Sequence, residues 1–316
     1  MKRRDFLKAA AITGLATTFK FTEGMDLMAQ KTGKIAKTNL KGGGTDLVAV
    51  MGGEPAQIFQ KAIAELGGMG KFVKKGQTVC IKPNIGWDKT PELASNTNPD
   101  LIAEIVRQCF SVGASEVVVF DNSCDDWRKA YKNSGIEAAA TGAGAKMMPA
   151  KEISYYRDIN LPRGVKLKSA KVHQAILDSD VWINVPVLKN HEGALMTISM
   201  KNHMGIVWDR GFFHRNDLQQ CIADICTLDK PAALHVVDAY RVMKTNGPRG
   251  RSTSDVANSK ALFVSSDIVA VDTAATKFFG QLVNMPLESV KHIALAQDLN
   301  LGTMDLSKLK VKKINL

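Results

Sequence analysis

This sequence has few cysteines and few aromatic residues, and it lacks several common ligand-binding motifs. Five cysteines occur among 316 residues without any C-x-x-C spacing, which argues against a zinc knuckle and an iron–sulfur cluster. Aromatic residues make up only 6% of the chain, which argues against a base-stacking surface for nucleic acid. Neither G-x-G-x-x-G nor G-x-x-x-x-G-K-S/T is present, so neither a dinucleotide-binding turn nor a Walker phosphate loop is supported. We therefore expect no iron–sulfur cluster and no nucleic-acid partner.

Basic residues outnumber acidic ones. Lys and Arg total 42 against 31 for Asp and Glu, which gives a formal net charge of +11. These charges are spread along the chain, as is typical of a solvated surface and not of a nucleic-acid stripe. Apolar residues make up 45% of the chain, an ordinary globular proportion. The excess positive charge favours a small anionic molecule, or an anionic envelope surface, as the partner.

The N-terminus resembles a targeting segment. The run Lys2-Arg3-Arg4-Asp5-Phe6-Leu7-Lys8 resembles a bacterial twin-arginine export motif. The weakly apolar stretch Ala9–Phe19 follows it and is too short to cross a bilayer core of ~30 Å as a helix. This resemblance implies export of the folded protein by the twin-arginine translocase to a periplasmic or otherwise extracytoplasmic location. A basic amphipathic N-terminus that arose by chance is the alternative.

The composition divides the chain into four parts. We predict an export segment over residues 1–30, a polar, Gly-rich flexible linker over 31–45, an α/β domain over 46–300 and an edge strand over 301–316. The stretch 150–172 is the least regular part of the domain. It is either a hairpin or a boundary between two closely joined lobes.

Short apolar runs alternate with helical patterns throughout the predicted domain. Strands are expected over residues 47–51, 78–81, 116–120, 181–185, 234–237 and 261–264. Helices are expected over residues 55–66, 99–112, 127–140, 194–204, 218–228, 268–279 and 287–299. This alternation predicts an α/β fold with a mostly parallel sheet and helices on both faces.

Polar residues follow most of the predicted strands. In an open parallel sheet, ligands bind at the carboxyl ends of the strands. The residues that would share this rim are Lys82, Asn84, Asp121, Lys189, His191, Asp238 and Asp267. The alternative explanation is that loops after strands are polar in any such fold. Lysines so close to buried runs are costly unless they have a role.

These residues suggest proton transfer on a bound anion. Crowding by like charge or burial lowers the pKa of a lysine towards the range of a general base, and histidine titrates near neutral pH. The predicted catalytic residues are Lys189, His191 and Lys201. The predicted substrate-binding residues are Lys82, Asn84, Asn202, Gly247, Arg249, Asp238 and Asp272. Structural ion pairs between the lysines and aspartates, an exposed basic turn around Gly247 and a purely structural Asp272 are the alternatives.

Metal binding is a weaker prediction. His191 and His203 are the candidate ligands, with His214 and Asp209 as further donors. The spacings between these histidines match no known metal signature. Cys124 stands between aspartates before a helix start, and we interpret it as incidental.

Five ordered motifs resemble the domain of unknown function 362 family. They are V-x-I-K-P-N, V-P-x-L-K-x-H, x-K-N-x-x-G, a D-A…G-P segment and S-D-x-V-A-V-D, found at Val79–Asn84, Val185–His191, Lys201–Gly205, Asp238–Pro248 and Ser266–Asp272. The resemblance extends over about Asp46–Leu299. Members of this family often carry either a twin-arginine leader or a ferredoxin-like cluster segment, and this chain has only the leader. A distant similarity to the nickel-pincer lactate racemase group would imply proton or hydride exchange at a hydroxy acid.

Three functions are consistent with these features. The first is an exported enzyme that acts on a small anionic substrate through the Lys/His cluster. The second is a non-catalytic envelope protein that binds an anionic ligand or cofactor. The third is a redox partner with a bound cofactor, whose identity the sequence leaves unknown.

Overall fold

The computed structural model describes residues 44–316. The predicted export segment and nearly all of the predicted linker lie outside the described residues. Within residues 44–316, no helix combines the length and the apolar character that a membrane crossing requires.

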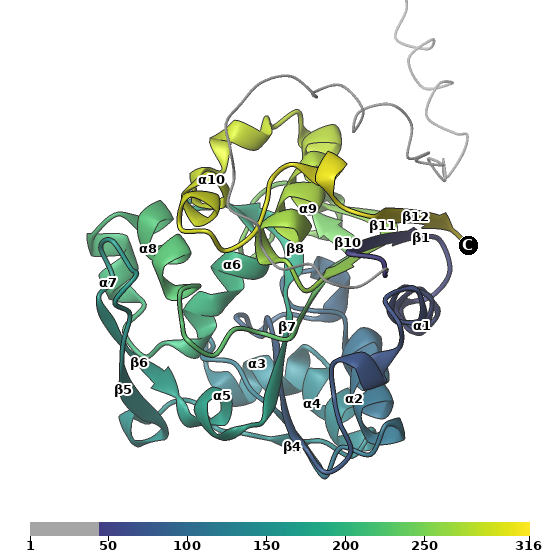
Figure 1. Ribbon diagram of the computed structural model, residues 1–316, viewed down its shortest axis with the longest axis horizontal. Helices are drawn as coiled ribbons and strands as arrows, with labels where there is room; N and C mark the ends of the chain where they lie inside the picture. The colour runs from purple at the N-terminus through teal and green to yellow at the C-terminus, as the bar shows by residue number, and fades with distance from the viewer. Residues whose placement is uncertain (1–43) are drawn as a thin grey trace, which may run out of the picture.

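A ten-stranded sheet forms the centre of the molecule (Figure 1). Its strands are β1 (Leu47–Met51), β2 (Thr78–Pro83), β3 (Glu116–Val119), β4 (Lys146–Met147), β7 (Val181–Val185), β8 (Val187–His191), β9 (Leu195–Thr197), β10 (Leu234–Met243), β11 (Val256–Ser265) and β12 (Val311–Asn315). They lie in the order β12-β1-β11-β10-β7-β2-β3-β4, with β8 paired to β10 and β9 paired to β8. Only the pairs β1–β11, β10–β11 and β8–β9 are antiparallel within this sheet. The predicted mostly parallel sheet is therefore confirmed.

Helices cover both faces of the sheet because its strands are apolar on both sides. Along β1, Val48 and Val50 enter one core cluster while Leu47, Ala49 and Met51 enter the other. The first cluster is covered by α1 (Pro55–Glu65), α2 (Pro99–Ser111), α3 (Trp127–Asn133) and α4 (Ile136–Gly142). The second is covered by α6 (Ser199–Asn202), α8 (Leu218–Ile225), α9 (Ile268–Val283) and α10 (Lys291–Asp298). Burial of both faces explains why the strands show no polar alternation.

Two of the expected helices are built differently. The expected helix 194–204 consists of β9, the short helix α6 and the 3-10 turn His203–Ile206. The helical pattern of apolar residues was misleading here, because the first of these residues form the strand β9, which pairs with β8. The expected helix 127–140 is split into α3 and α4 at Gly135, whose φ of 74° is left-handed and ends a right-handed helix.

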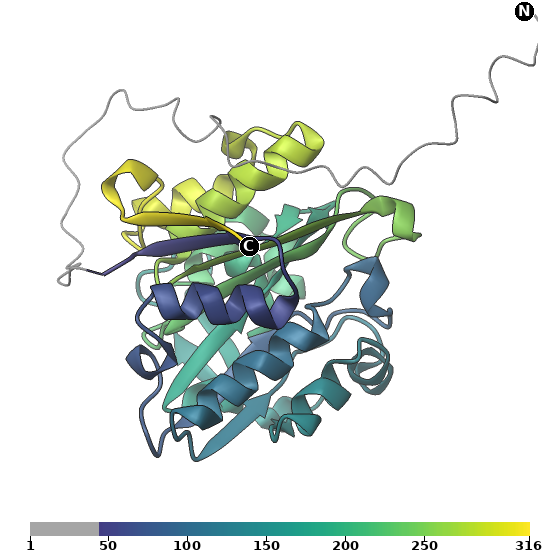
Figure 2. The same ribbon diagram turned by 90° about the vertical axis from the view of Figure 1, so that its right-hand side faces the viewer.

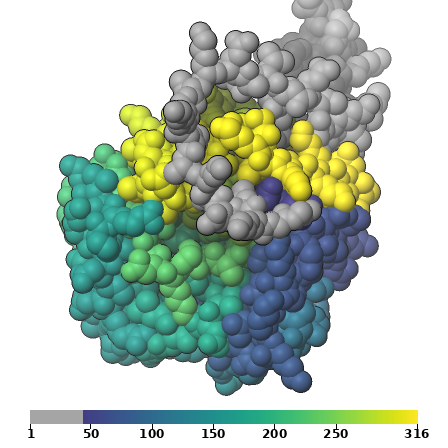
Figure 3. Space-filling model, viewed as in Figure 1, coloured from purple at the N-terminus to yellow at the C-terminus, as the bar shows by residue number. Residues whose placement is uncertain are grey.

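The irregular stretch 150–172 contains most of an antiparallel pair, β5 (Tyr156–Asn160) with β6 (Ser169–His173), followed by the short helix α5 (Gln174–Asp178). At the other end of the chain, β12 pairs in parallel with β1 at the edge of the main sheet. Figure 2 shows these two strands side by side next to α1, and Figure 3 shows the C-terminal residues in yellow against the N-terminal residues in purple. The first and last described strands are therefore neighbours.

The direction of β11 changes one expectation about the rim. Because β11 runs antiparallel to both of its neighbours, its carboxyl end lies next to the start of β1. Asp267 therefore does not share a rim with Lys82. Its side chain caps α9 by accepting from the Ala270 N–H at 2.8 Å and also accepts from Thr303 N at 3.1 Å.

Candidate functional site

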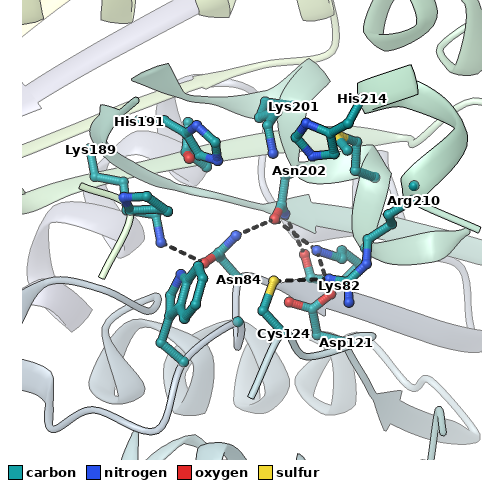
Figure 4. A pocket seen from close by; sticks show the side chains of 17 residues that line it. Lys82, Asn84, Asp121, Cys124, Lys189, His191, Lys201, Asn202, Arg210 and His214 are labelled. Atoms are coloured by element: carbon teal, nitrogen blue, oxygen red, sulfur yellow. Dashed lines mark hydrogen bonds and ion pairs between the residues drawn. The ribbon is translucent and has the colours of Figure 1, made fainter. Parts of the chain in front are cut away.

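A cavity of about 390 Å³ lies beyond the carboxyl ends of β2 and β3, between β8, α6 and α7 (Gly211–Arg215). Figure 4 draws the side chains that line it and labels ten of them, which converge from these elements and from the loops between them. The cavity brings together six of the predicted catalytic and substrate-binding residues, namely Lys82, Asn84, Lys189, His191, Lys201 and Asn202, along with Asp121 and His214.

Lys82 and Asp121 form a buried ion pair at the base of the cavity. Lys82 is 1% exposed, and its Nζ lies 2.9 Å from Asp121 Oδ1. Asp121 Oδ2 accepts the Ile85 N–H at 2.7 Å. Burial lowers the pKa of Lys82, and the neighbouring Asp121 opposes this effect. The backbone of Gly205 passes close to the pair, since a Cβ there would lie 2.0 Å from Asp121 Oδ1.

A chain of amide hydrogen bonds connects Lys82 to Lys189. Lys82 Nζ donates to Asn202 Oδ1 at 2.7 Å, and Asn84 Nδ2 donates to the same oxygen at 3.0 Å. Lys189 Nζ donates to Asn84 Oδ1 at 3.1 Å and to the carbonyl oxygen of Ser95. The Asn202 amide is fixed from behind, because its Nδ2 donates to Asn184 Oδ1 at 2.8 Å. Both lysines are thus held in place by neutral oxygen acceptors, and Lys82 is also paired with Asp121.

Burial lowers the pKa of Lys189 to about 7, and the nearby Lys201 contributes to this lowering. The Lys189 side chain is 1% exposed, so water stabilises its ammonium form poorly. A large fraction of Lys189 is then a neutral amine near pH 7. A neutral amine can accept a proton.

Lys201 differs from the other two lysines because its amine has no hydrogen bond or ion pair within residues 44–316. Figure 4 shows it pointing from α6 into the cavity between His191 and His214. Burial lowers its pKa to about 8, with Arg210 and Lys82 also disfavouring the charge. Lys201 is therefore free to contact a bound molecule.

The two histidines of the cavity are neutral at pH 7. Burial lowers the pKa of His191 to about 2, helped by Lys201 and Lys189. Its Nδ1 accepts the Ala194 N–H at 3.2 Å, which leaves Nε2 as the protonated nitrogen. Burial also lowers the pKa of His214, again with a contribution from Lys201.

Arg210, Trp87 and Cys124 line the cavity although the sequence analysis gave them no role there. Arg210 donates to the carbonyl oxygens of Asn122 at 2.6 Å and Ser123 at 3.0 Å, and it also contacts Cys124 Sγ at 3.1 Å. Trp87 forms part of the wall. Cys124 lines the cavity, although the sequence suggested an incidental role. Arg210 and Trp87 lie in loops, where no strand or helix pattern points to them.

Two predicted aspartates lie outside the cavity lining. Asp238 lies within β10, and its carboxylate accepts the backbone N–H groups of Asn98 at 2.7 Å and Tyr240 at 3.0 Å. Asp272 lies on α9 and accepts the N–H groups of Ser199 and Met200, both at 2.9 Å. Burial raises the pKa of Asp238 to about 6 and that of Asp272 to about 7. Neither carboxylate contacts a lysine of the cavity, and both instead hold backbone segments in place through the N–H groups that they accept.

The predicted basic turn lies beside the cavity. Gly247 packs against Asn190, because a Cβ on it would lie 1.8 Å from the Asn190 carbonyl oxygen. Arg249 pairs with Asp125 at 2.9 Å and lies over the Trp87 ring at 5.0 Å from its centre. Arg249 is thus already neutralised, and it supports the wall that Trp87 forms.

The predicted metal ligands do not converge. His203 lies outside the cavity lining, where its Nδ1 contacts the Ser199 carbonyl oxygen at 2.9 Å and its ring packs against Trp182. His191 lies within the cavity. Among the described residues, no group of three or more His, Cys, Asp or Glu side chains is arranged to hold a metal ion.

The cavity as a whole is cationic. Lys82, Lys189, Lys201 and Arg210 line it together with a single carboxylate, that of Asp121. Opposite charges within a partly buried site interact more strongly than in bulk water. The arrangement can hold an anion and offers amines that exchange protons near neutral pH.

Residues 79–277 match the family described as Domain of unknown function (DUF362). The chain belongs to the DUF362 family. A curated relative is the thylakoid-associated protein sll1697 of Synechocystis sp., with 24% identity over 219 residues, which is 67% of this chain and 65% of that protein. This chain thus spans less than two thirds of that relative's length.

A solved structure is also similar to this DUF362 protein. It is the lactate racemase apoprotein from Thermoanaerobacterium thermosaccharolyticum, with a TM-score of 0.43 and 13% identity over 72% of this chain and 55% of that chain.

Proposed function

We propose that this protein is an enzyme that binds a small anionic substrate in the cationic cavity and transfers a proton through its lysines. The observation that carries the proposal is the imbalance of charge at the cavity. Four basic side chains line it against one carboxylate, and that carboxylate is paired with Lys82. Substrate carboxylate or phosphate groups would supply the missing negative charge.

Arg210 and Lys201 are the groups that we assign to anion binding. The Arg210 guanidinium contacts backbone carbonyl oxygens and a thiol, and it has no carboxylate partner within the described chain. Lys201 has no partner there either. A charged hydrogen bond to an anion is about twice as strong as a neutral one.

Lys189 and Lys201 are the groups that we assign to proton transfer. Their pKa values of about 7 and about 8 lie close to neutral pH, where a general base works best. His191 would donate a hydrogen bond from Nε2, because its Nδ1 is occupied by the Ala194 N–H. Lys82 would remain a fixed cation because Asp121 pairs with it.

Calorimetric titration with inorganic phosphate and, separately, oxalate tests this proposal. We expect Lys201→Met to bind both anions roughly tenfold to a hundredfold more weakly, since a hydrogen bond to a charged group contributes about 1.5–3 kcal/mol. Lys129→Met, which removes an exposed lysine, should bind like the wild type. Equal affinity in the wild type and Lys201→Met would refute the assignment. Affinity that does not change with pH, together with no turnover of any anion, would favour a binding protein instead.

We also propose that the chain is exported to an extracytoplasmic location by the twin-arginine translocase. The support is the run Lys2–Lys8 and the short apolar stretch behind it. The translocase would be a transient partner of the N-terminal segment. The curated relative from Synechocystis sp. is named for its association with thylakoids.

A further inference from the structure

The three lysines of the cavity are held in different ways. Lys82 is paired with Asp121, and Lys189 donates to two oxygen atoms. Lys201 has no partner within residues 44–316. A lysine without partners is free to turn its amine towards an electrophile in the cavity, whereas the hydrogen bonds of Lys82 and Lys189 fix the direction of theirs.

The surroundings of Lys201 suit such an attack. In Figure 4 its side chain reaches into the cavity between the two imidazole rings. Arg210 lines the same side of the cavity as His214. There it can hold an anionic group of the molecule that Lys201 attacks. Burial and the nearby cations favour the neutral amine, with a pKa of about 8. Desolvation of this kind activates a lysine for addition to a carbonyl group.

We propose that Lys201 forms a Schiff base with a small oxo acid whose carboxylate is held by Arg210. This inference rests on the proposed function, because it uses the same anion-binding cavity. It adds the class of substrate, which is a molecule with both a carbonyl group and a carboxylate. It also gives the lysine on α6 a covalent role.

The proposed step is balanced without any further reactant. The Lys201 nitrogen forms a bond to the carbonyl carbon while the C=O π pair moves to oxygen, and proton transfer from nitrogen to oxygen gives a carbinolamine. The hydroxyl takes up one proton from water and leaves as a water molecule, and a C=N bond replaces the C–O bond, so the imine forms in its protonated state. Nothing is oxidised or reduced. The protonated imine withdraws electrons from the adjacent carbon, which eases the loss of a proton there.

His214 and His191 flank Lys201 and are suited to move these protons. Both rings are neutral because burial lowers their pKa values. A neutral imidazole can carry the proton from the ammonium of the first adduct to its oxygen, and can then pass a proton from water to the leaving hydroxyl. We assign this role first to His214, because the Nδ1 of His191 already accepts a backbone N–H.

Reductive trapping tests the inference. The full-length protein is incubated with cyanoborohydride and pyruvate or, separately, 2-oxoglutarate, and is then analysed by intact mass spectrometry and peptide mapping. We expect one adduct per chain, located at Lys201, and at least tenfold less adduct with acetone, which has the ketone but no carboxylate. Lys201→Arg keeps the charge and should lose the adduct. Lys129→Arg, at an exposed position, should keep it.

Two results would overturn the Schiff base. One is an adduct that maps to Lys82 or Lys189, or that persists in Lys201→Arg. The other is the absence of adduct with both oxo acids. The titrations with phosphate and oxalate separate this failure from that of the proposed function. A protein that binds these anions without forming an adduct keeps the function and loses the Schiff base, whereas a protein that binds neither anion loses both.

Discussion

At Gly205 the backbone passes so close to the buried ion pair that a β-carbon would lie 2.0 Å from Asp121 Oδ1 and 2.5 Å from Lys82 Nζ. Real β-carbons do not approach other atoms so closely. The pair must therefore move if any side chain is added at this position. Breaking a buried pair leaves a charge without compensation, which is costly.

We predict that Gly205→Ala destabilises the protein by about 1–3 kcal/mol, the usual cost of overpacking a core. The displacement of Lys82 should also weaken phosphate binding. Gly142→Ala is the matched control, since a β-carbon there meets nothing within 4 Å and alanine favours a helix. Urea unfolding followed by phosphate titration measures both effects. A Gly205→Ala protein as stable as Gly142→Ala would show that the pair adapts freely.

Lys189 makes the stability depend on pH. Its pKa falls from 10.5 to about 7 on folding, so between these values the unfolded chain binds more protons than the folded one. The free energy of unfolding should therefore rise with pH from about 7 towards 10.5, by at most about 1.4 kcal/mol per pH unit. The same contribution is lost as the pH falls through 7.

Urea unfolding between pH 7 and pH 10 checks this expectation. The slope against pH should be smaller in Lys189→Met and unchanged in Lys129→Met. The neighbouring titratable groups Lys82, Lys201, Asp121 and Cys124 are present in both variants, so the difference isolates Lys189. Identical slopes in the two variants would contradict the lowered pKa.

The sequence revealed those cavity residues that lie at the end of an apolar run. Lys82 lies in β2, Asn84 in the loop after it and Lys189 in β8. The sequence identified them because they are polar residues next to apolar runs. Arg210 and Cys124 come from loops whose approach to the cavity depends on tertiary packing. No local pattern encodes that approach.

At the scale of the elements, α6 is a helix of only four residues that carries Lys201 and Asn202. So short a helix is marginal by itself. Asp272 of α9 stabilises its start by accepting the N–H groups of Ser199 and Met200. The position of Lys201 therefore depends on a carboxylate that lies outside the cavity lining.

We predict that Asp272→Ala destabilises the protein by about 1–3 kcal/mol, since it leaves buried N–H groups without acceptors. It should also weaken phosphate binding, because α6 loses its anchor. Asp217→Ala is the control, because Asp217 caps α8 by accepting the Gln220 N–H at 3.1 Å. That variant should lose about 0.5–2 kcal/mol and keep its affinity. Full phosphate affinity in Asp272→Ala would show that α6 is held by other contacts.

The elements themselves were mostly predictable from apolar periodicity. The strands that became β1, β2, β7 and β10 begin at the predicted residues, because a run buried on both faces has no polar alternation. The antiparallel direction of β11 was not predictable, since a strand reads the same in either direction. This is why Asp267 was expected at the wrong end of the sheet.

At the scale of the whole molecule, the formal charge of +11 is matched by a cavity with excess positive charge. The steering of anions by such a field weakens as salt is added. The proposed export also concerns the whole folded molecule, because the twin-arginine translocase would carry it to an extracytoplasmic location.

We predict that Arg3→Lys combined with Arg4→Lys keeps the protein in the cytoplasm of the producing bacterium. Cell fractionation and immunoblotting of the periplasmic and cytoplasmic fractions measure the effect, and we expect at least a tenfold loss from the periplasm. Lys2→Arg, which keeps the arginine pair and the charge, is the control. Equal periplasmic amounts for all three proteins would overturn the twin-arginine assignment.

The pairing of β1 with both β11 and β12 has a consequence for biosynthesis. The partners of β1 begin roughly 210 residues (β11) and 260 residues (β12) further along the chain, and ribosomes add about 5–20 residues per second. The first strand therefore waits on the order of 10–50 s for its neighbours. During that time the unpaired backbone edge of this apolar strand is open to pairing with other nascent chains. The need of the nascent chain for chaperones should therefore increase with this interval. A circular permutant that begins at β2 and joins β12 to β1 would shorten the interval, because β1 would then be made after both of its partners.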